Sequence, residues 1–460
     1  MRRSIQKTLE WLNENLPGRL SVPGDDRYAA ATAIWAKPVG RTPRAVAHCQ
    51  TANDVQSVIR AARDAELPLS VRAGGHDWAG RALCEGIVID LRGMNAVIVD
   101  PDRTARISGG ARTADVLAVA DPLGLAAVTG SVGAVGMAGL TLGGGYGPLI
   151  GRFGLALDNL VAAEVVLADG QLVCASEDNE EELFWALRGG GGNFGVVTAM
   201  HHRLHELPSV RSGLVIYPFS EAKAVLERCV DIGTVAPEDF TVQVGFAAGP
   251  DAAPVVLIIP TWCGAAGEGE ARLQPFLNLG KLLACGVRET SYAASLTAFD
   301  SFIVNGRRTF METCWLAALD SGSIDIMIET MESAASSGCA IFTHEFKGAA
   351  SRVSAEATAF GLRRDHVLIE ILAAIVDRSD PLEERRHQQW ARAARRSFNP
   401  VALPGGYPNL LSAEEDANRV TKSYGGNAER LIKAKRHYDP DNVFRSAIPL
   451  PARAAMTDVA

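Results

Sequence analysis

Two glycine-rich stretches about sixty residues apart are the most informative feature of the chain. Residues 70–77 read Ser-Val-Arg-Ala-Gly-Gly-His-Asp, and residues 130–147 read Gly-Ser-Val-Gly-Ala-Val-Gly-Met-Ala-Gly-Leu-Thr-Leu-Gly-Gly-Gly-Tyr-Gly. Backbone with so little side-chain bulk lets N–H groups approach a large, flat, phosphate-bearing ligand. His76 follows the Gly-Gly turn directly, so it is a candidate for chemistry on that ligand, although a lone histidine is more often structural.

Composition limits the class of protein. The chain has 460 residues, of which 47% are hydrophobic and 21% are charged, so it can bury large cores in two or three domains. The formal net charge is -8, which argues against a nucleic-acid partner because such proteins normally present a basic face. The sequence therefore predicts an ordered globular protein that acts on something other than nucleic acid.

Cysteine usage and the N-terminus indicate a compartment. The eight cysteines are widely separated and form no Cys-x-x-Cys pair, which is typical of free thiols in a reducing environment. Residues 9–14 are amphipathic, and the N-terminus has no long apolar run, so we expect neither a signal peptide nor a membrane span. These features favour a cytoplasmic protein, either a monomer or a homodimer, with no membrane partner.

Strand and helix signals alternate in the first half of the chain, and the composition shifts near residue 207. This pattern predicts an α+β fold with two main domains, the second built on an antiparallel sheet flanked by helices. Asp169–Gly170 between two apolar runs predicts a hairpin. The expected divisions are 1–37 (helix and connector), 38–207, 208–404 and 405–460. Expected helices cover 51–65, 113–120, 180–187, 221–235, 324–336, 383–396 and 427–437, and expected strands cover 87–90, 161–167, 171–175, 241–246, 254–259, 340–346 and 367–376.

Several catalytic classes lack their motifs. The sequence has no Gly-x-Ser-x-Gly, His-Glu-x-x-His or Gly-Lys-Ser/Thr, so hydrolase and nucleotide-triphosphatase interpretations have no support. His201, His202 and His205 are close in sequence, but Arg203 intervenes and Glu206 is the only acidic residue nearby. We therefore expect no metal site.

The motifs together carry a family resemblance over nearly the whole chain. In order, they are Arg-Ala-Gly-Gly-His at 72–76, Leu-Thr-Leu-Gly-Gly-Gly-Tyr-Gly at 140–147, Gly-Leu-Ala-Leu-Asp-Asn-Leu at 154–160, Glu-Leu-Phe-Trp-Ala-Leu-Arg-Gly-Gly-Gly-Gly-Asn-Phe-Gly at 182–195 and Tyr-Asp-Pro-Asp-Asn-Val-Phe-Arg at 438–445. This series resembles FAD-linked oxidases of the vanillyl-alcohol-oxidase superfamily. It is most similar to the berberine-bridge-enzyme and 6-hydroxy-D-nicotine-oxidase group.

The resemblance implies a PCMH-type FAD-binding domain at 38–207, completed by residues 405–460, and a substrate domain at 208–404. It implies FAD attached covalently to His76. The first glycine loop would hold the pyrophosphate, the second stretch would lie along the flavin ring, and the Asn-Phe-Gly region would lie toward the adenosine part. The other cofactor-binding residues implied are Arg72, Ala73, Gly74, Gly75, Asp77, Gly130, Ser131, Val135, Gly136, Gly139, Gly143, Gly144, Gly145, Tyr146, Gly147, Asp158, Asn159, Gly192, Asn193, Gly195, Val196 and Val197.

The sequence departs from the family at three places. Val132 stands where doubly linked members have a cysteine, so we expect a single covalent link. Ala355 stands where our match places the catalytic glutamate of the plant enzymes, so their base cannot be carried over. Ser446–Pro449 replace an asparagine-containing segment, which casts doubt on one contact to the flavin edge. Val135 matches the position of the family's oxygen gate, which predicts ready reaction with dioxygen.

The resemblance implies an oxidase of a small organic alcohol or amine. A hydride would pass from a substrate C–H bond to the flavin, and dioxygen would reoxidise the flavin with formation of hydrogen peroxide. The candidate bases are Tyr407, which resembles a family active-site tyrosine, and His344 and Glu345, of which strand alternation places only one toward the flavin. Two alternatives remain: a flavin-dependent oxygenase or oxidative cyclase of natural products, and a catalytically silent FAD-binding protein.

Overall fold

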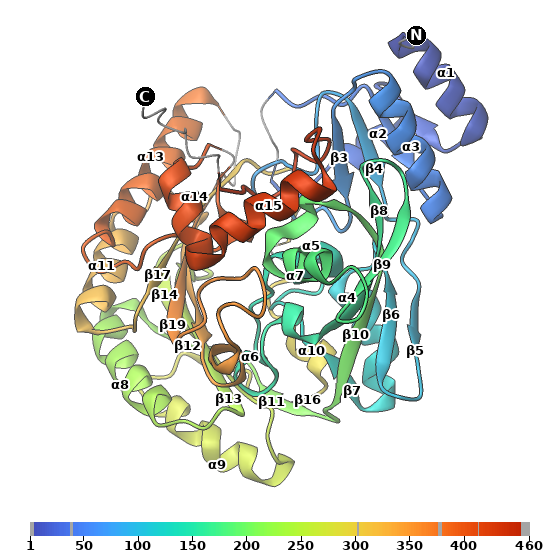
Figure 1. Ribbon diagram of the computed structural model, residues 1–460. Coiled ribbons are helices and arrows are strands. Elements are labelled where there is room, and N and C mark those ends of the chain that lie inside the picture. The colour runs from blue at the N-terminus through green and yellow to red at the C-terminus, as the bar shows by residue number, and fades with distance from the viewer. Residues whose placement is uncertain (1–3, 37–39, 301–302, 376–379, 413, 452–460) are drawn as a thin grey trace, which may run out of the picture.

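The computed structural model describes residues 4–36, 40–300, 303–375, 380–412 and 414–451. Over these ranges the chain forms the predicted α+β fold, in which an N-terminal domain with two sheets faces a C-terminal domain with one large sheet (Figure 1). The last helices return from the second domain and pack on the first.

The first sheet is largely parallel. Its order is β1-β2-β4-β3, with β2, β4 and β3 parallel to one another and β1 antiparallel to β2. The crossover from β2 to β3 runs through α3, whose N-terminus is closed by a capping box between Thr51 and Asp54. The elements are α1 (Ile5–Asn15), β1 (Leu20–Ser21), α2 (Asp26–Thr32), β2 (Ala45–His48), α3 (Ala52–Asp64), β3 (Leu69–Arg72) and β4 (Ile87–Asp90). Residues 4–36 thus contain β1 and α2 besides the expected helix, and β1 joins this sheet.

The second sheet of the N-terminal domain is antiparallel. Its order is β5-β6-β10-β8-β9, and β7 pairs with the far end of β10. The predicted hairpin joins β8 to β9, and Gly170 takes a φ of 82° in its turn. The elements of this region are β5 (Val97–Val99), β6 (Thr104–Ser108), α4 (Thr113–Ala120), β7 (Leu125–Ala127), α5 (Met137–Gly143), α6 (Ile150–Phe153), β8 (Leu160–Leu167), β9 (Leu172–Ser176), α7 (Glu181–Gly190) and β10 (Gly195–Glu206). Helix α5 lies within the second glycine stretch, where the sequence did not predict a helix, and it buries Met137 and Leu142 against α7.

The C-terminal domain is built on an antiparallel sheet in the order β15-β12-β14-β13-β18-β19-β17, with β11 and β16 at one side. Helices α8, α11 and α13 cover its outer face and share a core with alternate residues of its strands. The strands are β11 (Val210–Ser212), β12 (Val215–Pro218), β13 (Phe240–Ala248), β14 (Pro254–Trp262), β15 (Ala284–Cys285), β16 (Arg288–Thr290), β17 (Thr309–Leu316), β18 (Cys339–Phe346) and β19 (His366–Ala374). The helices are α8 (Ala222–Thr234), α9 (Gly269–Leu273), α10 (Tyr292–Ser295), α11 (Ser321–Glu332), α12 (Ala349–Arg352) and α13 (Pro381–Ser397). The predicted strands and long helices lie within a few residues of these bounds.

Helices α14 (Ala417–Tyr424) and α15 (Ala428–Tyr438) bring the chain back to the N-terminal domain. Arg430 of α15 lies 3.9 Å from the ring centre of Trp185 on α7 and pairs with Glu182 at 2.6 Å. The Asp439 carboxylate, just after α15, accepts hydrogen bonds from the backbone N–H groups of Val443 and Phe444. This turn directs the following residues back toward the glycine-rich stretches.

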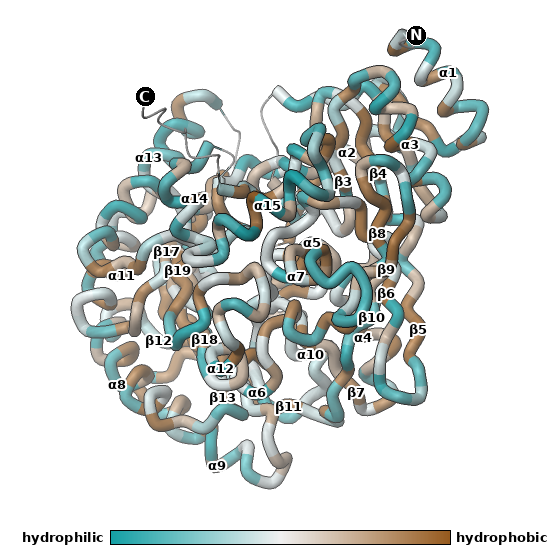
Figure 2. Tube along the Cα trace, viewed as in Figure 1, coloured by the Kyte–Doolittle hydropathy of each residue, from teal (hydrophilic) through white to brown (hydrophobic). Residues whose placement is uncertain are grey.

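Hydropathy follows the layers. Hydrophobic residues concentrate on strands such as β4 and β8, whereas the outer helices mix hydrophilic and hydrophobic residues (Figure 2). Among the described residues, no helix is both long and apolar enough to cross a bilayer. Within the same residues, no group of three or more His, Cys, Asp or Glu side chains is arranged to hold a metal ion. The close histidines diverge because His202 is buried against the Ala156 carbonyl while His205 stacks on Phe153.

Candidate active site

The first glycine stretch forms a tight loop at the carboxyl end of β3. Gly75 takes a φ of 80° there, a conformation that favours glycine. A Cβ on Gly74 would lie 2.4 Å from the Gly136 nitrogen, so the two glycine stretches touch through bare backbone. The Asp77 carboxylate accepts hydrogen bonds of 3.0 and 2.7 Å from two backbone N–H groups further along the loop. These contacts fix the position of His76.

His76 sits in an aromatic cluster. Its ring stacks on Trp35 with centres 4.8 Å apart and meets Trp78 edge-on at 5.5 Å. Burial lowers the pKa of His76 to about 4, against the opposing effect of the Glu370 and Asp77 carboxylates. The imidazole is therefore neutral at neutral pH, which is the form that can act as a nucleophile.

A cavity of about 1060 Å³ opens beside His76 and separates two walls. We call one the glycine wall, which is formed by residues within 73–78, 130–140 and 191–197. We call the other the sheet wall, which is the inner face of the large antiparallel sheet. The C-terminal residues 444 and 446–448 also line the cavity. A volume of this size accommodates a large cofactor portion together with a small substrate.

Strand alternation decides which residues of the sheet wall reach the cavity. On β18, Phe342 and His344 line the cavity, whereas Ile341 belongs to the core under the outer helices. On β19, Glu370 and Leu372 line the cavity, whereas the alternate residues Ile369, Ile371 and Ala373 belong to that same core. Each strand thus presents one set of side chains to the site and the other to the helices.

The sheet wall holds a polar cluster from three neighbouring strands. His344 Nε2 lies 3.2 Å from Gln243 Nε2 and 3.4 Å from Glu370 Oε2. Gln243 and His344 are partly enclosed on β13 and β18, and Glu370 comes from β19. A carboxylate beside an imidazole can accept a proton and pass it on, so this cluster is suited to general base chemistry.

Tyr407 also lines the cavity, at the junction of the two domains. Its hydroxyl oxygen accepts hydrogen bonds from the Gly145 backbone N–H at 2.8 Å and from Asn409 Nδ2 at 3.0 Å. Burial raises the pKa of Tyr407 to about 12, so the hydroxyl keeps its proton at neutral pH. Tyr407 therefore lines the cavity with a protonated hydroxyl that can donate a hydrogen bond there, and its catalytic role stays a prediction.

Glu345 is contradicted as a candidate base. It follows His344 on β18 and so points to the opposite face of the sheet, where its carboxylate accepts from the Val242 backbone N–H at 2.9 Å and pairs with Lys347 at 3.2 Å. Burial raises the pKa of Glu345. The expectation that only one of these two neighbours faces the cavity is confirmed, and that residue is His344.

The predicted cofactor residues divide into two groups. Those that line the cavity are Ala73, Gly74, Gly75, His76, Asp77, Gly130, Ser131, Val135, Gly136, Gly139, Tyr146, Gly192, Gly195, Val196 and Val197. Those away from its lining are Arg72, Gly143, Gly144, Gly145, Gly147, Asp158, Asn159 and Asn193. In the second group, the glycines allow close packing between segments: a Cβ on Gly145 would lie 2.4 Å from the Ala156 Cβ.

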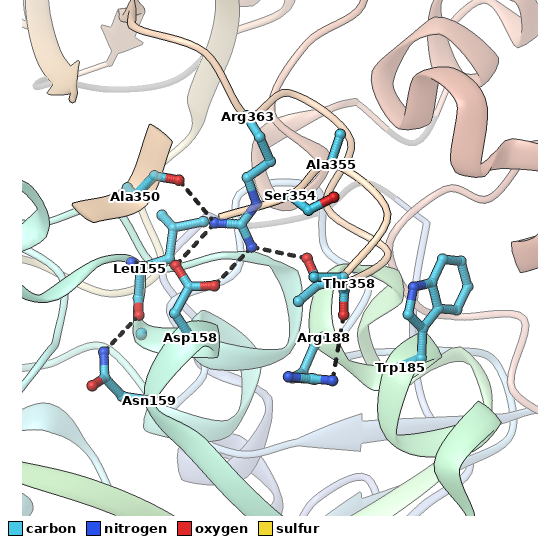
Figure 3. Close-up of polar contacts among 12 residues, drawn as sticks. Leu155, Asp158, Asn159, Trp185, Arg188, Ala350, Ser354, Ala355, Thr358 and Arg363 are labelled. Atoms are coloured by element: carbon cyan, nitrogen blue, oxygen red, sulfur yellow. Dashed lines mark hydrogen bonds and ion pairs between the residues drawn. The ribbon is translucent and has the colours of Figure 1, made fainter. Parts of the chain in front are cut away.

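Asp158 has a structural partner. Both of its carboxylate oxygens accept from Arg363, at 2.9 and 2.7 Å, and the two side chains are 10% and 1% exposed (Figure 3). Arg363 lies in the segment between α12 and β19, which also contains Ala355, and the pair ties this segment to the N-terminal domain. Ala355 lies outside the cavity lining, and its carbonyl accepts from Asn427. Its identity therefore carries no information about the catalytic base, and the case for a catalytically silent protein loses its motivation.

Three more predicted residues bind backbone carbonyls. Arg72 donates to the carbonyls of residues 30, 31 and 33 at the end of α2, so it positions the segment that carries Trp35. Asn159 Nδ2 donates to the Phe153 and Leu155 carbonyls, which fixes a turn. Asn193 Nδ2 donates to the Ile448 carbonyl at 2.9 Å, so it holds the C-terminal tail against the cavity.

Sequence reasoning missed Trp35, Gln243 and Glu370. Glu370 carried a readable signal, because it is the only charged residue in the apolar run from Val367 to Val376, and an acidic residue inside such a strand needs a reason. Trp35 and Gln243 carried no comparable signal. Their importance comes from neighbours that are distant in sequence.

Three features of the cavity fit the cofactor that the motifs imply. A Cβ on Gly139 or Gly192 would meet no atom within 4 Å, so both glycines present open backbone to the cavity. The buried Trp35 Nε1 has no hydrogen-bond partner among the described residues, and its ring lines the cavity. Open backbone at two glycines, an unpaired Trp35 N–H and a neutral His76, all lining the cavity, fit a flat, phosphate-bearing flavin nucleotide.

Comparison with known families agrees with this fit. Residues 43–176 match the FAD binding domain family, and residues 406–451 match the family described as Berberine and berberine like. The two matched segments contain the glycine wall's first two stretches and the chain's return to the N-terminal domain.

Similar proteins extend over the whole chain. It is 31% identical to (R)-6-hydroxynicotine oxidase of Paenarthrobacter nicotinovorans, over 94% of this chain and 96% of that protein. It is 30% identical to the FAD-linked oxidoreductase aurO of Gibberella zeae, over 91% of this chain and 82% of that protein. The crystal structure of 6-hydroxy-D-nicotine oxidase from Arthrobacter nicotinovorans superimposes with a TM-score of 0.83 at 29% identity, covering 95% of this chain and 98% of that one.

Proposed function

The chain belongs to the FAD-linked oxidoreductases of the berberine-bridge-enzyme and 6-hydroxynicotine-oxidase group, and we propose that it oxidises a small organic alcohol or amine with FAD held covalently by His76. The observation that carries this proposal is the arrangement of the cavity: a neutral histidine on the glycine wall faces a carboxylate–imidazole pair on the sheet wall.

The residues that would hold FAD are those of the glycine wall. Gly74 and Gly136 bring two backbone stretches together, and Gly139 and Gly192 leave room for a bulky ligand. Bound FAD supplies a two-electron acceptor that takes a hydride from the substrate and delivers both electrons to dioxygen, which leaves as hydrogen peroxide. Val132 offers no thiol, so His76 is the single point of attachment.

Glu370 is the proposed base. As hydride leaves the substrate carbon, the hydroxyl or amine on that carbon must lose a proton, and the Glu370 carboxylate faces the cavity where that group would lie. His344, 3.4 Å away, orients the carboxylate and offers a second site for the proton. Gln243 fixes the position of His344 from the neighbouring strand.

The proposal is tested on the purified holoprotein. Acid precipitation should leave a yellow pellet, and a proteolytic peptide containing His76 should carry the mass of the flavin, with no flavin on any cysteine peptide. An anaerobic screen of alcohols and amines should bleach the flavin, and readmitted air should restore the colour with one hydrogen peroxide per turnover. Free FAD in the acid supernatant, or a flavin that no alcohol or amine bleaches, would contradict the proposal. Oxygen from dioxygen found in the product would point to an oxygenase instead.

A further inference from the structure

The side chains on the sheet wall change in character along the strands. Register places Glu370 opposite Thr313 and Phe342, Leu372 opposite Met311 and Ala340, and Ala374 opposite Thr309. The polar cluster therefore lies at one end of the wall, apolar residues line its middle, and the first residues of β17 lie at the other end. Arg307, just before β17, lines the cavity at that other end.

The middle of the wall is apolar and partly aromatic. Phe342 meets Phe299 edge-on at 5.5 Å, and both line the cavity. The other lining residues of this band are Ile216, Ala247, Val255, Leu257, Met311, Ala340 and Leu372. A hydroxyl-rich sugar would leave most of its groups unpaired here, whereas an aromatic body gains both burial and ring contacts.

Arg307 lies at the open end of this band. No hydrogen bond or ion pair joins its guanidinium to any residue that the structure describes. The local fold does not depend on the guanidinium either, because backbone makes the contacts here: Gly306 N–H donates to the Ile34 carbonyl at 2.8 Å, and Arg307 forms a β-bridge with Ala36. Arg307 is six residues from Thr313, the register partner of Glu370, which at ~3.3 Å per strand residue corresponds to about 20 Å along the wall.

We propose that the substrate of this cavity is an elongated aromatic alcohol or amine that carries an anionic group at the end remote from the reacting carbon, and that Arg307 binds this group. This inference rests on the oxidase function proposed above. The reacting carbon lies beside Glu370 and His344, the aromatic body covers Phe342 and Leu372, and the anion pairs with the guanidinium at the edge. Arginine suits this role because its planar fork matches a carboxylate and its charge is constant with pH.

The test measures binding separately from oxidation. The probe 4″-hydroxy-p-terphenyl-4-carboxylate has a hydroxyl at one end and an anion at the other but no oxidisable C–H bond beside the hydroxyl. Its affinity for the holoenzyme is read from the change in the visible spectrum of the flavin and compared with that of the neutral 4″-hydroxy-p-terphenyl-4-carboxamide. The variants are Arg307→Gln, Arg307→Lys and, as a control, Arg396→Gln, which removes an exposed charge from the outer helix α13.

In the wild type, the carboxylate should bind about tenfold more tightly than the carboxamide, as one charge-assisted contact provides. This ratio should fall to about one in Arg307→Gln, recover in part in Arg307→Lys and stay unchanged in Arg396→Gln. Equal affinities in the wild type, an unchanged ratio in Arg307→Gln, or no spectral change with either probe would overturn the proposal.

A second compound separates this proposal from the oxidase function. The analogue 4″-(hydroxymethyl)-p-terphenyl-4-carboxylate adds the oxidisable carbon, and under anaerobic conditions it should bleach the flavin. If the carboxylate preference appears but this alcohol does not bleach the flavin, recognition by Arg307 stands and the proposed oxidation fails. If the alcohol bleaches the flavin with the same half-saturating concentration in the wild type and Arg307→Gln, the oxidase function stands and the role of Arg307 is overturned.

Discussion

The two walls of the cavity are built in opposite ways. The glycine wall comes from short, contiguous stretches whose main contribution is backbone, and it includes His76, the proposed point of flavin attachment. The sheet wall is formed by side chains that alternate along strands far apart in sequence, such as Gln243, His344 and Glu370. The residues expected to bind the cofactor are therefore close together in sequence, whereas those proposed to act on the substrate are brought together only by folding.

The largest effect is expected from His76→Ala on the glycine wall. The covalent link should be lost completely, while FAD should still bind, because the bare backbone of the wall is unchanged. Acid precipitation should then give a colourless pellet and a yellow supernatant. A pellet that remains yellow would show that another residue carries the flavin and would break the assignment of this wall.

On the sheet wall, Glu370→Gln removes a proton acceptor but keeps the size of the side chain. The rate of anaerobic flavin reduction should fall by about 10²–10⁴-fold, the usual contribution of a general base, with flavin content unchanged. Glu345→Gln is the matched control, because it makes the same chemical change on the opposite face of β18, and its reduction rate should stay near that of the wild type. Equal losses in the two variants would remove the distinction between the two faces of the sheet.

Val135→Leu tests the prediction that dioxygen reaches the flavin past this residue of the glycine wall. Val135 lines the cavity, and an added methylene in packed surroundings costs about 1–3 kcal/mol, which corresponds to a roughly 5- to 150-fold lower rate if dioxygen must pass this side chain. Stopped-flow reoxidation of chemically reduced enzyme should be slowed by this amount, with flavin reduction by substrate unchanged. Reoxidation at the wild-type rate would show that Val135 is only a packing residue.

The rate of covalent flavin attachment should depend little on pH, because His76 is buried in the glycine wall and stays neutral. The lowered pKa of His76, about 4, keeps the imidazole neutral at every pH above that value. The rate of covalent attachment in apoprotein mixed with FAD should therefore change little between pH 8 and 5.5. A histidine with an ordinary pKa of about 6.5 would be neutral in only about a tenth of molecules at pH 5.5, so a tenfold fall would contradict the burial of His76.

The smallest effect on the reaction is expected from Asp158→Asn, because Asp158 lies outside the cavity lining. Arg363 would lose its buried partner, so the free energy of unfolding should fall by about 3–5 kcal/mol in urea titrations. Flavin content and the rate of flavin reduction in the folded variant should match the wild type. A selective loss of flavin, without the loss of stability, would return Asp158 to the cofactor-binding residues.

Sequence reasoning succeeded for features that depend on neighbours along the chain. The strands and long helices follow the apolar periods, and the hairpin follows from Asp169–Gly170. The family follows from the glycine stretches, because only glycine supplies backbone without a side chain. It missed helix α5, since helix propensity is weak there and packing against α7 decides the conformation.

Two expectations show where a sequence pattern stops being informative. Asp158 stands in a motif next to the glycine stretches, yet a buried arginine more than two hundred residues later takes both of its oxygens. Tyr407 was expected as a base, but burial raises the pKa of its hydroxyl to about 12, against the effect of two N–H donors that lower it. Each residue has a partner distant in sequence, Arg363 for Asp158 and Gly145 for Tyr407, which a local pattern could not reveal.

The sequence by itself determined the α+β class, the FAD-linked family and His76 as the candidate attachment point, because each depends on residues within one short stretch. Only the tertiary structure decided which face of each strand meets the cavity, that Glu370 and His344 come together while Glu345 is turned away, and that the Arg307 guanidinium has no hydrogen-bond or ion-pair partner among the described residues. The physical reason is that charge, burial and pKa depend on which atoms lie within a few ångströms of one another, and the fold sets those distances.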